Sequence, residues 1–111
     1  MRAILRTVLG DVSPAGLGLM LPHEHLITTP PVNACPDSDY RLDDVEKAIE
    51  EVDQFKRAGG TLLVEMTPDG YGRDVGALQR IARETGVHIA STTGFMHERF
   101  MPADVFSYCQ S

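Results

Sequence analysis

Two amphipathic helices alternate with short apolar runs along this chain, and that alternation restricts the fold more than any other feature. The first helix is predicted to begin at Asp43, with Glu46 in a position typical of a capping box, and to end at Gly59-Gly60. The second is predicted to begin at Asp74 and to end at Gly86. Apolar residues recur at helical spacing in both, which indicates one buried stripe on each helix. The residues expected on these stripes are Val45, Ala48, Ile49, Val52 and Phe55 in the first helix and Val75, Leu78, Ile81 and Ala82 in the second.

The apolar runs beside the helices are expected to be strands. Residues 61–67 and 87–93 are nearly continuous apolar stretches, and such stretches predict strands buried on both faces, as in a parallel sheet. With the run that begins at Leu17, the order becomes βαβαβ, which implies parallel strands joined by right-handed crossovers. The remaining expectations are a short strand over residues 3–8, a turn over residues 10–16 and a helix start within residues 102–106.

The run from Leu17 either pairs back on the first strand as a hairpin or begins a core strand, and it leads into His23-Glu24-His25. In a strand, side chains alternate between the two faces, so His23 and His25 would point to one side and Glu24 to the other. Two neutral imidazoles on one face can hold a metal ion. Without context, two histidines that hold no metal are an equally good interpretation, and the strand-helix units that follow favour the metal.

Two loops bear on the approach to these histidines. Residues 28–40 contain three prolines, and we expect them to shape that approach, although a linker between domains is the alternative. Gly70-Tyr71-Gly72 precedes a helix but has the spacing of neither glycine-rich phosphate fingerprint. A nucleotide-binding or flavodoxin-like domain is therefore the weaker interpretation.

The composition narrows the class of protein. The 111 residues carry a formal net charge of −6, which argues against non-specific nucleic-acid binding. No apolar run is long enough to span a bilayer, and the start of the chain lacks the shape of a signal peptide. Cys35 and Cys109 are too few for a disulfide framework. We therefore expect a cytoplasmic protein with neither nucleic acid nor membrane as its partner.

Several segments share their order and spacing with a known family: residues 7–10, 17–18, 22–26, 64–68, 72–74 and 87–95. Together they resemble the phosphotriesterase-related proteins of the amidohydrolase superfamily, over about Thr7 to Val105. The resemblance implies an α/β fold, the (β/α)8 TIM barrel. Such barrels run to about 250 residues. We therefore expect residues 1–111 to be the N-terminal part of a single metal-dependent hydrolase domain, a truncated βαβαβ portion with an N-terminal β-hairpin.

The resemblance also implies a divalent metal cofactor. In the family, the histidines matched by His23 and His25 bind one of two metals, usually zinc. A carboxylated lysine or a glutamate on the fourth strand bridges the metals, and further ligands come from later strands that this chain lacks. His88 is not expected to replace them, because it lies near the start of its strand and the active face of a barrel is at the other end.

Three more residues are candidates for the surroundings of the metals. Glu65, at the end of its strand, could support a metal-bound histidine through a hydrogen bond, and a merely structural carboxylate is an equally good interpretation. Met96 stands where many relatives carry a Tyr or Trp that lines the substrate pocket. His97 follows it, and simple solvent exposure is the better interpretation there.

Two functions from different classes follow. The first is a zinc-type hydrolase of ester bonds, phosphotriesterase- or lactonase-like, acting on a small-molecule ester or lactone. The 111 residues alone are expected to be inactive because most of the metal ligands are absent. The second is a non-catalytic α/β module that forms a homo-oligomer or binds a partner. Metal content separates the two.

Overall fold

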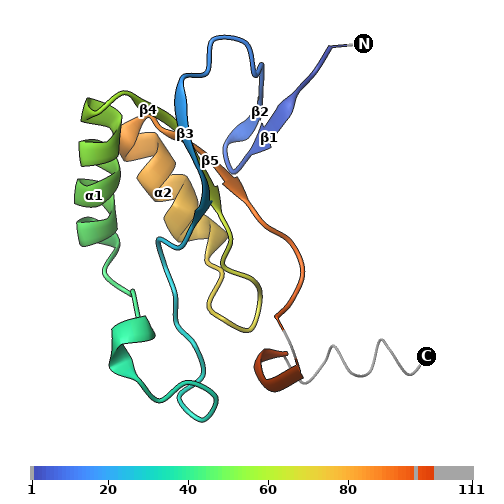
Figure 1. Cartoon of the computed structure of the whole chain (residues 1–111), viewed down its shortest axis with the longest axis vertical. Coiled ribbons are helices and arrows are strands. Elements are labelled where there is room, and N and C mark those ends of the chain that lie inside the picture. The colour runs from blue at the N-terminus through green and yellow to red at the C-terminus, as the bar shows by residue number, and fades with distance from the viewer. Residues whose placement is uncertain (1, 97, 102–111) are drawn as a thin grey trace.

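A three-stranded parallel sheet, covered by two helices, forms the body of the protein (Figure 1). The computed structural model describes residues 2–96 and 98–101. The strands lie in the order β3-β4-β5, with α1 between β3 and β4 in the sequence and α2 between β4 and β5. The predicted βαβαβ arrangement is confirmed. Its elements are β3 (Leu19–Glu24), α1 (Val45–Arg57), β4 (Gly60–Glu65), α2 (Val75–Thr85) and β5 (His88–Ser91).

The loops that follow β3, β4 and β5 gather at one end of the sheet, the lower end in Figure 1. This follows from the parallel pairing, since parallel strands bring their carboxyl ends to one edge. β4 and β5 pair in unbroken register. β3 is irregular between Leu21 and Glu24, a segment that contains Pro22, which has no N–H to donate. Such irregularities change the direction of side chains near sites. Short 3₁₀ helices lie in two loops, at Ser38–Tyr40 and Glu98–Phe100.

The core lies between the helices and the sheet. The apolar stripe of α1 contributes Ala48 and Val52, and that of α2 contributes Leu78, Ile81 and Ala82, all of them buried. These side chains pack with strand residues such as Leu63 and Ile89 in one cluster. The stripe predicted for α2 is wrong at its first position: Val75, the first residue of the helix, is 42% exposed.

The predicted N-terminal hairpin is present, and of the two alternatives for the run from Leu17 the core strand is confirmed. β1 (Leu5–Thr7) pairs antiparallel with β2 (Gly10–Val12), so part of the predicted 10–16 turn is a strand. The reversal occurs at Val8 and Leu9, where the Thr7 hydroxyl donates to the Gly10 carbonyl at 2.7 Å. The run from Leu17 therefore begins a core strand. The hairpin lies beside β5, and the Val8 N–H donates to the Ile89 carbonyl at 2.9 Å.

Several predicted boundaries shift by a few residues. The N-cap of α1 is Asp44 rather than Asp43, and its side chain accepts from the Lys47 N–H. The cap of α2 is Asp74, as predicted, and Gly86 ends that helix in a left-handed conformation. The strands predicted over 61–67 and 87–93 are shorter, ending at Glu65 and Ser91. The helix start within 102–106 and His97 lie outside the described residues. Across the described ranges, no helix is long and apolar enough to cross a membrane.

Candidate metal site and pocket

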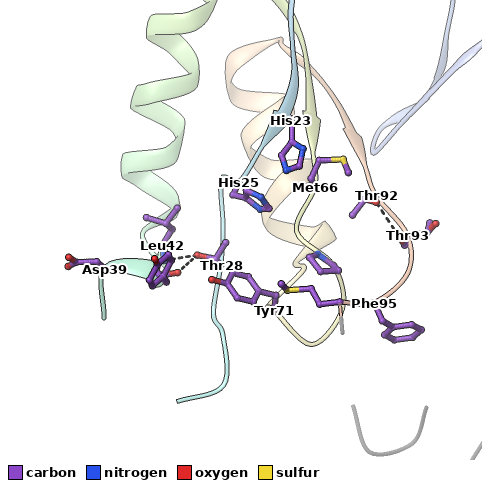
Figure 2. A pocket seen from close by; sticks show the side chains of 13 residues that line it. His23, His25, Thr28, Asp39, Leu42, Met66, Tyr71, Thr92, Thr93 and Phe95 are labelled. Atoms are coloured by element: carbon purple, nitrogen blue, oxygen red, sulfur yellow. Dashed lines mark hydrogen bonds between the residues drawn. The ribbon is translucent and has the colours of Figure 1, made fainter. Parts of the chain in front are cut away.

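A pocket of about 560 Å³ opens where β3, β4 and β5 end. Figure 2 shows its lining side chains, which come from the end of β3 and from the segments that follow all three strands. Most of the lining is apolar or aromatic, and Asp39 contributes the one carboxyl group among the described lining residues. Such a composition is typical of sites for small molecules. The lining residues are His23, His25, Thr28, Asp39, Tyr40, Leu42, Met66, Pro68, Tyr71, Thr92, Thr93, Phe95 and Met96.

His23 and His25 both face this pocket, at the carboxyl end of β3 (Figure 2). Their ring centroids are 5.3 Å apart, and the ring planes meet at 62°. Glu24, between them, does not line the pocket. The two imidazoles therefore lie on one wall of the pocket, as the alternation predicted for this segment requires.

A buried hydrogen-bonded group stands behind His25. The His25 Nδ1 lies 2.9 Å from the Thr67 Oγ1, and the Thr67 hydroxyl is in turn hydrogen-bonded to Glu65 Oε1. Thr67 and Glu65 have no exposed surface. Glu65 Oε1 also accepts from the backbone N–H groups of Thr67 at 3.2 Å and Leu26 at 3.4 Å. The other carboxylate oxygen, Oε2, has no hydrogen-bond partner among the described residues.

The donor set suits part of a metal site. Neutral imidazole nitrogens are common ligands of zinc and related ions, and two of them share one wall of the pocket. Catalytic zinc usually has three protein ligands. Within residues 2–96 and 98–101, no group of three or more His, Cys, Asp or Glu side chains is placed to hold a metal. The residues present therefore fit a divalent metal as two of its ligands, not as a whole site.

Two loops close the sides of the pocket. Thr28 pins the loop after β3: its hydroxyl donates to the Tyr40 carbonyl at 2.6 Å, and its backbone pairs with Leu42. The Thr29 N–H donates to the Tyr71 carbonyl at 2.9 Å, which ties this loop to the one after β4. The tie needs Gly72, because a Cβ there would overlap Thr29. The backbone holds the two loops together, so the pocket wall is preformed.

Tyr71 presents a neutral phenol to the pocket. Burial raises the pKa of Tyr71 above its ordinary value, and the neighbouring Cys35 and Tyr40 raise this pKa further. The ring also packs edge-on against Phe100, with centroids 5.4 Å apart. At neutral pH the phenol can thus donate or accept a hydrogen bond, but it is no anionic base.

The structure distributes the other candidates over three places. Met96 lines the pocket beside Phe95. Glu65 is not part of the lining and lies behind His25. His88 is the first residue of β5 and borders a different hollow, near Gly86 and Thr7. It therefore lies at the amino end of its strand, opposite the carboxyl ends that bound the pocket.

Thr67, Thr28 and Tyr71 were not anticipated as parts of the site. The sequence holds one usable signal for them, since each follows a strand of the parallel sheet, β3 for Thr28 and β4 for Thr67 and Tyr71, where loops of such a sheet collect.

Comparisons with known proteins give matches to this chain in sequence and in structure. The phosphotriesterase family matches residues 3–111. A human N-acetyltaurine hydrolase is 37% identical over 82% of the chain, and a phospho-furanose lactonase from Mycoplasmopsis agalactiae is 36% identical over 86%. Among solved structures, a lactonase from Listeria monocytogenes superimposes with a TM-score of 0.81 at 33% identity, over 95% of the chain.

The matches cover only part of each relative. The chain spans 34% of the human protein, 28% of the mycoplasmal lactonase and 33% of the Listeria lactonase. What is shared is therefore about one third of a full-length relative, including the strand that carries His23 and His25.

Proposed function

This chain belongs to the phosphotriesterase family, and from that premise we propose that it contributes to a metal-dependent hydrolase of ester bonds, similar to phosphotriesterases and lactonases. The observation that carries the proposal is the placement of His23 and His25 on one wall of the pocket at the carboxyl end of β3. Residues 1–111 would then be one part of a single barrel domain, because the chain spans about a third of its relatives.

The proposal assigns His23 and His25 to one divalent metal, zinc in the first instance. The family is generally metal-dependent, and two imidazoles on one wall suit such an ion. A pair of metals, when bound, lowers the pKa of a bound water and polarises the oxygen of the bond to be cleaved. We expect the remaining ligands from barrel strands outside these residues.

The pocket itself supports a small ester or lactone as substrate. Apolar side chains such as Met66, Phe95 and Met96 offer contact for the uncharged part of such a molecule. The Tyr71 phenol and the Thr92 and Thr93 hydroxyls offer hydrogen bonds at the rim. Asp39, the one acid among the described residues of the lining, would repel an anionic group bound next to it.

The function is tested in a completed barrel. The chain replaces the matching third of the Listeria lactonase, and the chimera is assayed with zinc, cobalt or manganese against a lactone, an aryl phosphotriester and N-acetyltaurine. We expect metal-dependent turnover that His23→Ala or His25→Ala reduces by at least about 100-fold, because a ligand to the metal is lost. His88→Ala, at the opposite end of the sheet, serves as the matched control and should leave turnover unchanged. If the His23→Ala chimera showed the same metal-dependent turnover as the unmodified chimera, His23 would not be a ligand of the catalytic metal.

Zinc binding by the chain alone gives a second test. Two ligands are fewer than catalytic zinc usually has, so the 111 residues should bind zinc weakly, as measured by competition with a chromophoric chelator. The His23→Ala, His25→Ala double variant should abolish that binding. Tight stoichiometric zinc that persists after dialysis of the double variant would contradict the proposal.

One observation favours a second candidate, a non-catalytic module that associates through its sheet. Leu19 and Met20 are 53% and 45% exposed on β3, a strand that pairs only with β4 among the described strands. A chimera that folds and binds no metal would favour this alternative.

A further inference from the structure

We propose that Thr67 is a positioning residue that fixes His25 in the tautomer with its proton on Nδ1, so that Nε2 presents a lone pair. The inference concerns the proton arrangement at Thr67, and it rests on the proposed function only in taking His25 as a metal ligand. A neutral imidazole has one donor and one acceptor nitrogen, and a ligand nitrogen must be the acceptor. Whatever fixes the donor therefore decides which nitrogen is available to a metal.

Glu65 sets the direction of the Thr67 hydroxyl. Its Oε1 accepts the backbone N–H groups of Thr67 and Leu26, at 3.2 and 3.4 Å. An oxygen that receives two N–H groups acts as an acceptor in this geometry. The single hydrogen of the Thr67 hydroxyl is therefore donated to Glu65 Oε1, the partner to which it is closely bonded.

With its hydrogen committed to Glu65, the Thr67 oxygen can only accept from His25. The His25 Nδ1 lies 2.9 Å from this oxygen, a normal hydrogen-bond distance, so Nδ1 must carry the proton. Thr67 and Glu65 have no exposed surface, and a buried polar group cannot exchange its partner for solvent without a cost. The arrangement is therefore held firmly, and it directs Nε2 of His25 away from Thr67, while the ring lines the pocket.

The opposite arrangement is the competing possibility. If the Thr67 hydroxyl donated to His25 Nδ1, the ring proton of His25 would be on Nε2. The lone pair of Nδ1 would then accept the Thr67 hydrogen and would not be available to a metal. Glu65 Oε1 would then keep only its two N–H partners. His25 could bind a metal in that state only after rearrangement.

The first test reads the tautomer directly. The chain is labelled with ¹⁵N-histidine, and the imidazole nitrogen shifts of His25 are recorded without metal, in solution or by magic-angle spinning, which also accepts an associated chain. We expect the Nδ1–H form in the unmodified protein, and its assignment is secured by the loss of the signal in His25→Ala. The Nε2–H form would overturn the proposal without any Thr67 variant.

The second test separates the hydroxyl from the bulk of the side chain. Thr67→Val removes the hydroxyl at similar volume, and Thr67→Ser keeps it. We expect a mixture of tautomers and about 10- to 100-fold weaker zinc binding in Thr67→Val, the usual effect of removing a hydrogen-bond partner of a ligand. Thr67→Ser should retain the tautomer and an affinity within a few-fold of the original.

The outcomes distinguish this inference from the proposed function. Equal zinc affinity in all three proteins, with binding lost in His23→Ala, would keep the metal ligands and overturn the role of Thr67. An Nδ1–H tautomer that depends on the Thr67 hydroxyl, in a protein that binds no zinc at all, would support the positioning role and remove the metal assignment. If Thr67→Val does not fold, the tautomer of the unmodified protein and of Thr67→Ser decides.

Discussion

Glu65 has no exposed surface, and its two carboxylate oxygens have unlike surroundings. Oε1 accepts from two backbone N–H groups and the Thr67 hydroxyl, whereas Oε2 has no partner among the described residues. Glu65 joins the ends of β3 and β4, because Leu26 follows β3, Thr67 follows β4, and both donate backbone N–H groups to its Oε1. The carboxylate thus organises the strand ends as well as supporting His25.

Glu65→Ala should lower the free energy of unfolding by about 2 kcal/mol, because each buried donor left without an acceptor costs about 1–3 kcal/mol. The loss is smaller than the sum for three donors, because the substitution also removes Oε2, a buried polar atom without a partner. Urea unfolding followed by circular dichroism measures the change.

Glu50→Ala is the matched control for this substitution. Glu50 is an exposed residue of α1, and exposed substitutions usually change the free energy by less than about 0.5 kcal/mol. Equal effects of the two substitutions would show that the Glu65 contacts contribute nothing to stability.

At this scale the sequence could predict part of the site. The alternation His23-Glu24-His25 correctly placed both imidazoles on one wall of the pocket, as extended backbone does, although β3 itself ends at Glu24. The contact between His25 and Thr67 could not be predicted, since it depends on the offset between β3 and β4 and on the irregularity near Pro22. No pattern in one strand reports its register against another.

At the scale of elements, the start of α1 distinguishes two adjacent aspartates. Asp44 accepts from the Lys47 N–H at 3.1 Å, so Asp44→Ala should cost about 1 kcal/mol of stability, the usual value for a lost N-cap. Asp43→Ala, one residue earlier, should cost much less, and urea unfolding of the two variants gives the comparison. A larger loss of stability in Asp43→Ala than in Asp44→Ala would show that Asp43 is the N-cap of the helix.

The predicted start of α1 was wrong by one residue for a physical reason. Asp43 and Asp44 can each accept from an N–H three residues later. The choice is made by the phase of the helix, which has to bury Ala48 and Val52 against α2 and the sheet. Packing of this kind is settled by the tertiary structure, so only the existence of the helix and its apolar stripe could be predicted.

The loops after β3 and β4 meet at Gly72. Its φ is +98°, and a Cβ at this position would overlap the backbone and side chain of Thr29. Gly72→Ala should therefore destabilise the chain by more than about 1 kcal/mol and separate the two loops that bound the pocket. Thermal unfolding gives the first effect, and amide hydrogen exchange at Thr29, which donates to the Tyr71 carbonyl, gives the second.

Gly76→Ala provides the control within the same segment. Gly76 lies in α2, and an added Cβ there would meet only Asp74 Oδ1 at an ordinary distance of 3.5 Å. Alanine is favoured over glycine in helices by up to about 1 kcal/mol, so this variant should be as stable as the original or more so. Unchanged exchange at Thr29 in Gly72→Ala would show that the tie between the loops does not depend on the glycine.

For the whole molecule, the sequence predicted the parallel sheet, its helices and their order, because apolar periodicity and helix caps are local signals. It did not predict where the hairpin reverses, because the residues from Gly10 to Val12, part of the predicted turn, form β2 and the reversal lies at Val8 and Leu9. The pocket likewise depends on three loops brought together by the parallel strands, and their side-chain contacts have no local signature.

The last prediction concerns the 111 residues as an isolated molecule. β3 pairs only with β4 among the described strands, and it exposes Leu19 and Met20. A free strand edge with apolar side chains is a template for pairing with other chains. The isolated chain should therefore associate, and it should show no turnover of esters or phosphotriesters with added zinc, since two histidines are fewer ligands than a catalytic metal usually has.

A charge placed on this edge should reverse the association. Met20→Lys puts an ammonium group on β3, a substitution of the kind by which natural proteins protect exposed edges, and it should shift sedimentation velocity profiles towards the monomer. Val75→Lys is the matched control, since Val75 is similarly exposed, at 42%, but lies on α2. Equal effects of the two lysines would mean that net charge, not the edge of β3, governs association. A different result would show that copies of this segment can complete one another's site. In that case the associated chain would show metal-dependent turnover, the monomer would show none, and His23→Ala would abolish the turnover.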